Sequence, residues 1–105
     1  MDTIGEYDMT DLMTLVITER AEGVSITPGQ PPAVHIRDEV HRIEGPAVAP
    51  GHASSLLRTI ADTRQMRELH EHSRAEFLFT FRESQFRVTA RREHDDVHFH
   101  IHTTA

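Results

Sequence analysis

Apolar residues near the start of the chain recur at the spacing of one helix face. They fall at every third or fourth position, which is the stripe of an amphipathic helix: Met9, Leu12, Met13, Val16 and Ile17. Asp8 and Asp11 are suited to cap the first turn, where the helix dipole favours negative charge. Gly23 follows the last apolar position, and we expect it to end this helix.

The pattern then changes to alternation, which is typical of half-buried strands. Short alternating runs predict strands over residues 24–26, 34–36 and 40–43. The proline and glycine residues at positions 28–32 predict a turn between the first two strands, and residues 37–39 predict a tight connection before the third. We therefore expect one helix followed by three short strands in the first part of the chain.

Two more helices are predicted in the middle of the chain. The first has its apolar stripe over residues 53–60, and Ser54 and Ser55 are interpreted as caps at its start. The second begins at Asp62, which forms the pattern of a capping box with Gln65. Both helices are expected to turn their apolar stripes toward a common core.

Three alternating runs end the chain and predict strands over residues 76–81, 85–91 and 97–102. The first run places a phenylalanine at every second position, and we interpret this stripe as core: Phe77, Phe79 and Phe81. One helix, three strands, two helices and three strands describe an α+β fold. We predict an antiparallel sheet of about six strands with the helices packed on one face.

Composition narrows the classes of function. A chain of 105 residues without cysteine or an apolar run of membrane length indicates a single cytoplasmic domain with no disulfide, no signal peptide and no membrane insertion. All 11 basic residues are arginine, and the net charge is −6 with neutral histidines. Because nucleic-acid binding needs a basic footprint, this balance argues against a nucleic-acid partner.

Four short segments carry a family resemblance at fixed spacing. Residues 21–26 read A-E-G-V-S-I, residues 29–32 read G-Q-P-P, residues 36–43 read I-R-D-E-V-H-R-I, and residues 86–90 read F-R-V-T-A. These resemble the A-S-D-L-H-L, G-x-P-P, V-D-G-D-V-R-R-I and F-R-V-N-A segments of the PilT-type pilus retraction and type II/IV secretion ATPases. The resemblance is to their N-terminal, PAS-like domain and extends from about Asp8 to Ala105.

The resemblance implies a PAS-like domain over residues 9–105, preceded by an N-terminal extension over residues 1–8. In that family, a separate RecA-like domain carries the ATPase and its phosphate loop, which needs a lysine. This sequence has no lysine and ends where the family's linker to the ATPase domain begins. We therefore expect a domain that is not an enzyme and has no cofactor, either excised from a longer protein or a free-standing copy of the non-catalytic half.

The sequence also departs from the family pattern. Gly23 and Ser25 replace an aspartate and a histidine, Asp38 replaces the glycine of the hairpin, and His102 replaces an arginine near the end. Asp38 can still adopt a turn conformation through its side chain. These departures indicate a divergent relative or one without the family's motor role.

Three histidines alternate along the last predicted strand, at His98, His100 and His102. Alternation puts the three imidazoles on one face, while the residues between them point to the core. The outer two lie about 13 Å apart at ~3.3 Å per residue, which is too far for one zinc ion to bind all three. An alternative is a small-ligand or metal-binding domain that uses the strand of His98, His100 and His102. In that case His98 and His100, with His94 or a side chain of a neighbouring strand, are the candidate metal ligands.

The favoured interpretation is a partner-binding or anion-binding surface on the same sheet face. By alternation, the three histidines share that face with Arg82, Arg87 and Arg91, and His35 is expected to join them. In the resembling ATPases, the strand arginines of this domain lie toward the nucleotide at a subunit boundary, and Arg87 best matches that position. The resemblance implies a protein partner, a pilus or secretion ATPase or assembly component, or further copies of the chain.

Overall fold

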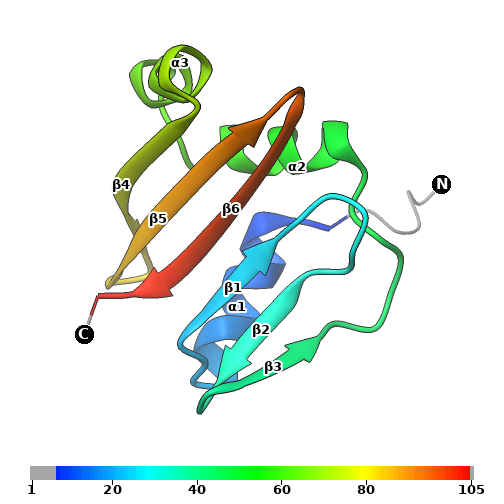
Figure 1. Ribbon diagram of the computed structural model, residues 1–105. Coiled ribbons are helices and arrows are strands. Elements are labelled where there is room, and N and C mark those ends of the chain that lie inside the picture. Colours follow the sequence, from blue (N-terminus) through cyan, green and yellow to red (C-terminus); the bar gives the residue numbers. More distant parts are fainter. Residues whose placement is uncertain (1–6, 105) are drawn as a thin grey trace, which may run out of the picture.

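The structure, a computed structural model, describes residues 7–104 (Figure 1). Its elements follow the predicted order of helices and strands. The helices are α1 (Met9–Thr18), α2 (Pro50–Arg58) and α3 (Thr63–His72). The strands are β1 (Gly23–Ile26), β2 (Ala33–Ile36), β3 (Glu39–Arg42), β4 (Arg74–Phe81), β5 (Ser84–Glu93) and β6 (Asp96–Thr103).

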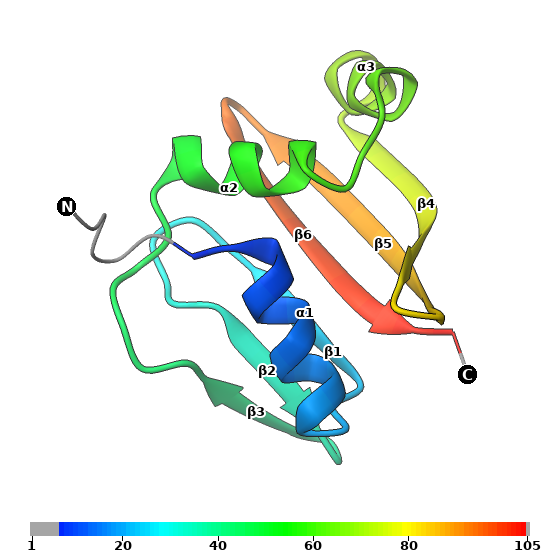
Figure 2. The ribbon, with the colours of Figure 1, turned by 180° about the vertical axis from the view of Figure 1, so that it is seen from behind.

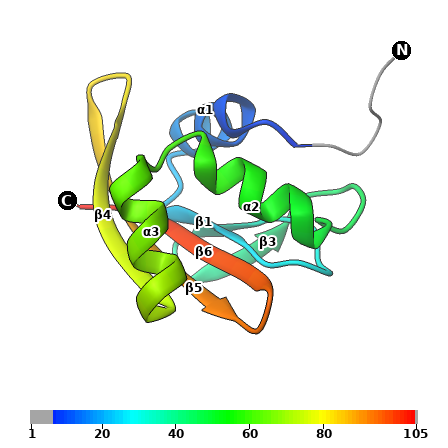
Figure 3. The same ribbon diagram turned by 90° about the horizontal axis from the view of Figure 1, so that it is seen from above.

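The six strands form one sheet in the order β3-β2-β1-β6-β5-β4. Each neighbouring pair is antiparallel, and the first strand of the chain lies beside the last in the middle of the sheet. Figure 2 shows α1 and α2 in front of the strands, with α3 beside β4, and Figure 3 shows the helices along one side of the sheet. The predicted α+β class, with helices on one face of a six-stranded sheet, is confirmed.

The core fills the space between the helices and the inner face of the sheet. The stripe of α1 contributes Met9, Leu12, Met13 and Val16. Alternate residues of the strands contribute the opposite wall, which consists chiefly of Val24, Ile26, Val34, Phe86, Val88, Ala90, Phe99 and Ile101. Burial of this apolar area is the main favourable term in folding. The predicted phenylalanine stripe lies at the edge of the core, where Phe77, Phe79 and Phe81 are partly buried against it.

The helix caps are partly as the sequence predicts. The Asp8 carboxylate accepts from the backbone N–H of Thr10 at 2.7 Å, and Asp62 and Gln65 form a capping box at the start of α3. The interpretation of Ser54 and Ser55 as caps is wrong, because α2 begins four residues earlier at Pro50. Proline at the first helical position has no N–H to leave unpaired, and the residue before it, Ala49, makes no side-chain capping bond.

Gly23 does not end the first helix. Helix α1 ends at Thr18, and the chain reverses through Arg20 in the left-handed conformation, with φ of 54°. Gly23 is instead the first residue of β1, where its missing side chain allows β6 to approach closely. Glycine near a helix end often marks a cap, but at position 23 a glycine is needed because the backbone of β6 lies too close for a side chain.

Most of the N-terminal extension predicted over residues 1–8 lies outside the described residues. Its last two residues contact the domain. The Tyr7 backbone N–H donates to His52 Nε2 at 2.9 Å, and its hydroxyl donates to the Pro46 carbonyl at 2.6 Å. Asp8 caps α1.

None of the helices found between residues 7 and 104 is long and apolar enough to cross a bilayer.

Candidate functional site

The sheet face without helices, which we term the outer face, is open in Figure 1. Residues opposite one another in antiparallel strands point to the same face, so the register assigns each side chain. One row crosses all six strands through Leu78, Arg87, His102, Gly23, His35 and Val40. The next row crosses through Glu76, Thr89, His100, Ser25, Ala33 and Arg42.

The register brings most of the predicted site residues together. His102 is opposite Arg87, and His98 is opposite Arg91. Phe99 and Ile101, which alternate with the histidines of β6, are only 2% and 0% exposed. The prediction that the three histidines share one face with these two arginines is therefore confirmed in its geometry.

Arg82 lies elsewhere. Strand β4 ends at Phe81, and Arg82 and Glu83 form a two-residue turn with φ of 48° and 71°. The Arg82 guanidinium lies over the Phe81 ring, 5.0 Å from its centre. Strand alternation does not continue through a turn, so the expectation that Arg82 shares the outer face with Arg87 does not hold.

Ser25 is a site residue that the sequence analysis treated only as a departure from the family. Its hydroxyl Oγ lies 2.8 Å from His35 Nε2 and 2.6 Å from His100 Nδ1. It thus links imidazoles of β2 and β6 through β1. Alternation places Ser25 on the outer face, but its two partners depend on the strand order, which a single sequence does not supply.

His35, His100 and His102 form a compact group that we term the histidine cluster. The ring centres of His35 and His100 are 5.0 Å apart, and those of His100 and His102 are 5.2 Å apart. Burial lowers the pKa of His100 below the usual histidine value, and the charges of His35 and His102 lower this pKa further. Neighbouring imidazoles therefore resist being charged together.

Gly23 lies at the base of a shallow hollow of about 430 Å³ beside the histidine cluster. Its lining consists of Glu22, Gly23, His35, His100, His102 and Thr103. The charged residues of the outer face surround this centre. Glu76 and Arg42 lie on the edge strands β4 and β3, while Glu93 and Asp96 lie at the β5–β6 turn. The middle of the face thus presents imidazoles, hydroxyls, the guanidinium of Arg87 and the carboxylate of Glu22.

The described residues do not supply further ligands for the alternative metal site at His98 and His100. Between residues 7 and 104, no group of three or more histidine, cysteine, aspartate or glutamate side chains is placed to hold a metal ion. His98 Nε2 lies 3.9 Å from the Glu93 carboxylate, which is an ion-pair distance when the imidazole is protonated. His94 lies in the β5–β6 turn.

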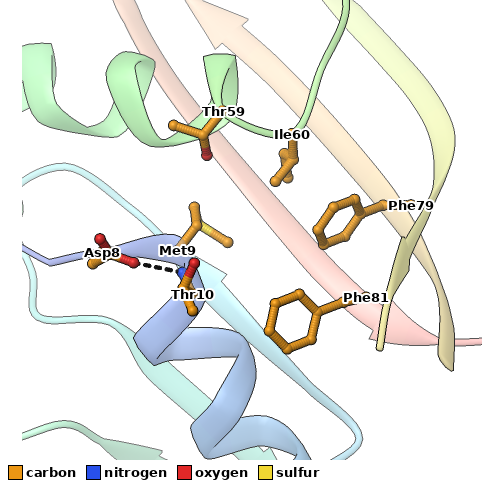
Figure 4. A pocket seen from close by; sticks show the side chains of 7 residues that line it. All are labelled: Asp8, Met9, Thr10, Thr59, Ile60, Phe79 and Phe81. Carbon is orange, nitrogen blue, oxygen red and sulfur yellow. Dashed lines mark hydrogen bonds between the residues drawn. The ribbon is translucent and has the colours of Figure 1, made fainter. Parts of the chain in front are cut away.

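A separate hollow of about 200 Å³ lies on the helical side of the sheet. Figure 4 shows Phe79 and Phe81 pointing from β4 toward the start of α1 and the end of α2. Its lining consists of Asp8, Met9, Thr10, Thr59, Ile60, Phe79 and Phe81. Among these residues the only titratable side chain is Asp8, whose carboxylate caps α1, so the hollow offers no group free for acid–base chemistry.

Solved structures with the same fold include a pilus retraction motor and an ATPase. The crystal structure of the pilus retraction motor PilT with bound ADP matches 95% of this chain with a TM-score of 0.84 and 20% identity. The X-ray structure of the Legionella pneumophila ATPase DotB matches 100% of this chain with a TM-score of 0.82 and 16% identity. No protein-family model matches the sequence, and no curated protein matches it.

The matched region is a minor part of each ATPase. This chain covers 30% of the PilT chain and 31% of the DotB chain. The likeness to this ATPase family, drawn above from four short segments, is confirmed at the level of the fold. It is consistent with the N-terminal domain of such ATPases.

Proposed function

We propose that this chain is a non-catalytic interaction domain that docks through its outer face. The proposed partner is an ATPase domain or another component of a pilus or secretion assembly in the cytoplasm. The observation that carries the proposal is the row across the sheet, in which Arg87 and the histidines lie between two exposed apolar residues. Leu78 is 50% exposed and Val40 is 56% exposed, at opposite ends of this row.

The composition of the face supports a protein partner. Interfaces combine apolar contacts with arginine, which binds carboxylates through two parallel hydrogen bonds. The outer face offers an exposed arginine on β5, the strand next to the edge strand β4, and no helix covers this face in the described residues. The resemblance supports the kind of partner, because its family uses the same domain beside an ATPase.

The sequence supports a non-catalytic role. Phosphoryl transfer by a phosphate-loop ATPase needs a lysine that reaches the terminal phosphates. The chain contains no lysine at any position. The chain spans less than a third of the two ATPases, so the activity belongs to a part of those proteins that this sequence does not match.

The test compares two charge reversals on opposite sides of the domain. Arg87→Glu reverses a charge in the row of residues that crosses the outer face, while Arg64→Glu makes the same change on exposed α3. The tagged domain and both variants are used to capture partners from the source cells, with identification by mass spectrometry. We expect wild type and Arg64→Glu to recover a pilus or secretion ATPase or assembly component, and Arg87→Glu to lose at least tenfold of it.

Equal recovery by all three proteins would show that the outer face is not the docking surface. Recovery of no ATPase or assembly component by the wild type would contradict the kind of partner. Circular dichroism of both variants controls for folding, because both positions are exposed and neither substitution opens the core.

A further inference from the structure

A second hollow on the outer face lies on the other side of His100 from Gly23. It has a volume of about 150 Å³ and lies where β1, β5 and β6 are neighbours. Its lining consists of Ser25, Thr27, Thr89, Arg91, His98, Phe99 and His100. We term it the Ser25 hollow.

All residues lining the Ser25 hollow except Phe99 have side chains that can donate hydrogen bonds. It contains three hydroxyls, two imidazoles and one guanidinium, and it contains no carboxylate. By contrast, the hollow over Gly23 includes Glu22. Hydroxyls and arginine are the side chains that bind phosphate oxygens, and arginine does so with charge-assisted hydrogen bonds.

We propose that the Ser25 hollow binds a phosphate group. Three strands supply donors from different directions, which suits a tetrahedral group with three or four oxygens better than a planar carboxylate with two. The inference rests on the proposed function, because both place binding on the outer face. Arg91 supplies the charge, and Thr89 and Thr27 supply hydroxyls from opposite sides of β6.

Ser25 couples this site to the histidines. A hydroxyl has one proton, yet Ser25 Oγ is within hydrogen-bond distance of a nitrogen on His35 and a nitrogen on His100. At least one of these nitrogens must therefore carry hydrogen and donate to Ser25. When His100 is neutral and accepts at Nδ1, the Ser25 proton is used in that bond.

Protonation of His100 changes this arrangement. Its Nδ1 then donates to Ser25, so the Ser25 hydroxyl proton is free to donate to an anion in the hollow. The cation also attracts that anion directly. A bound phosphate favours the charged form of His100, so we expect binding to raise the lowered pKa of His100. Binding should then take up a proton at pH values below the usual histidine value.

Several charged groups surround His100 and take part in this balance. His35 faces it from β2, while His98 and His102 flank it on β6. Arg87 and Arg91 lie on β5 on either side of Thr89, the residue opposite His100. The nearby acidic residues are Glu22, which lines the neighbouring hollow with His100, Glu93, which lies 3.9 Å from His98 Nε2, and Glu76, which is opposite Thr89 on β4.

The test is an NMR titration of the whole chain with inorganic phosphate, with sodium acetate as the carboxylate arm. Backbone amide and histidine ring signals report binding at His98 and His100. The variant is Arg91→Gln, and the matched control is Arg87→Gln, four residues away on the same strand and the same face. We expect saturable shifts with phosphate, about tenfold weaker binding in Arg91→Gln, and a change of less than about twofold in Arg87→Gln.

A titration with sulfate at pH 7.5 and at pH 5.5 tests the coupling, because sulfate keeps its charge over this range while phosphate does not. We expect tighter binding at the lower pH, and Ser25→Ala should reduce that difference. Thr89→Val, which keeps the side-chain shape, should weaken binding at both pH values.

Linear shifts without saturation, or equal losses in Arg91→Gln and Arg87→Gln, would overturn the proposal because they indicate diffuse screening. Acetate binding as tight as phosphate would overturn the assignment to a phosphate group. These outcomes are independent of partner capture. Phosphate binding with no captured ATPase contradicts the docking function, whereas capture without phosphate binding contradicts only this inference.

Discussion

At the scale of single residues, Gly23 determines how closely the two central strands approach. A Cβ added there would collide with the backbone carbonyl oxygen of Ile101 and would lie 3.0 Å from the Cα of His102. Both obstacles are backbone atoms, so no change of rotamer relieves them. Gly23 also lines the hollow beside His35.

Gly23→Ala therefore tests the packing of β1 on β6. We expect it to destabilise the fold by about 1–3 kcal/mol, the usual cost of forcing extra atoms into a packed region. Gly51→Ala is the control, because a Cβ at this position in α2 meets nothing within 4 Å and alanine favours the helix. The measurement is urea unfolding followed by circular dichroism. Equal stability of Gly23→Ala and wild type would contradict the close approach.

At the scale of elements, the alternation of apolar residues and the residues typical of turns predict most of the helices and strands. The sequence alone predicts correctly which residues of β6 face the core, because Phe99 and Ile101 are buried and alternate with the histidines. The same reasoning fails where an element ends, and Arg82 shows this: its position continues the alternation of β4, yet it belongs to the turn. Propensity and period identify an element well, but its last residue depends on the geometry of the connection.

The β2–β3 hairpin shows the cost of an imperfect turn residue. Arg37 and Asp38 connect the strands with φ of 49° and 69°, the left-handed conformations of a tight two-residue turn. The resembling family has glycine where this chain has Asp38. We expect Asp38→Gly to stabilise the domain by about 0.5–1 kcal/mol, because glycine adopts positive φ without strain.

Asp38→Ala is the matched change in the opposite direction. Alanine lacks the side-chain oxygen that helps aspartate adopt this conformation, so we expect it to lower the unfolding free energy. Thermal melts of wild type and both variants provide the measurement. A lower melting temperature for Asp38→Gly than for Asp38→Ala would contradict the assigned turn.

The Ser25 site marks the limit of prediction from this sequence. Ser25 and His100 are separated by 75 positions, and their contact follows from the pairing of β1 with β6. Alternation indicates which face each residue occupies but does not say which strands are neighbours. The arginines and histidines of β5 and β6 could be predicted to share a face, whereas the hydroxyl that links two imidazoles required the register.

At the scale of the whole molecule, the helices close one face of the sheet and leave the other open (Figures 2 and 3). The open face has Arg87 and the histidine cluster in the middle, with exposed Leu78 and Val40 at its two ends. The fold itself is shared with PilT and with DotB.

Site-specific photo-crosslinking tests the docking face most directly. A photoreactive side chain is placed at Leu78 on the outer face or at Arg64 on α3, and the domain is irradiated in its source cells. The account predicts that position 78 forms an adduct with a pilus or secretion ATPase or assembly component, and that position 64 forms little or none. Adducts with such a protein from position 64 alone, or equally from both positions, would contradict it.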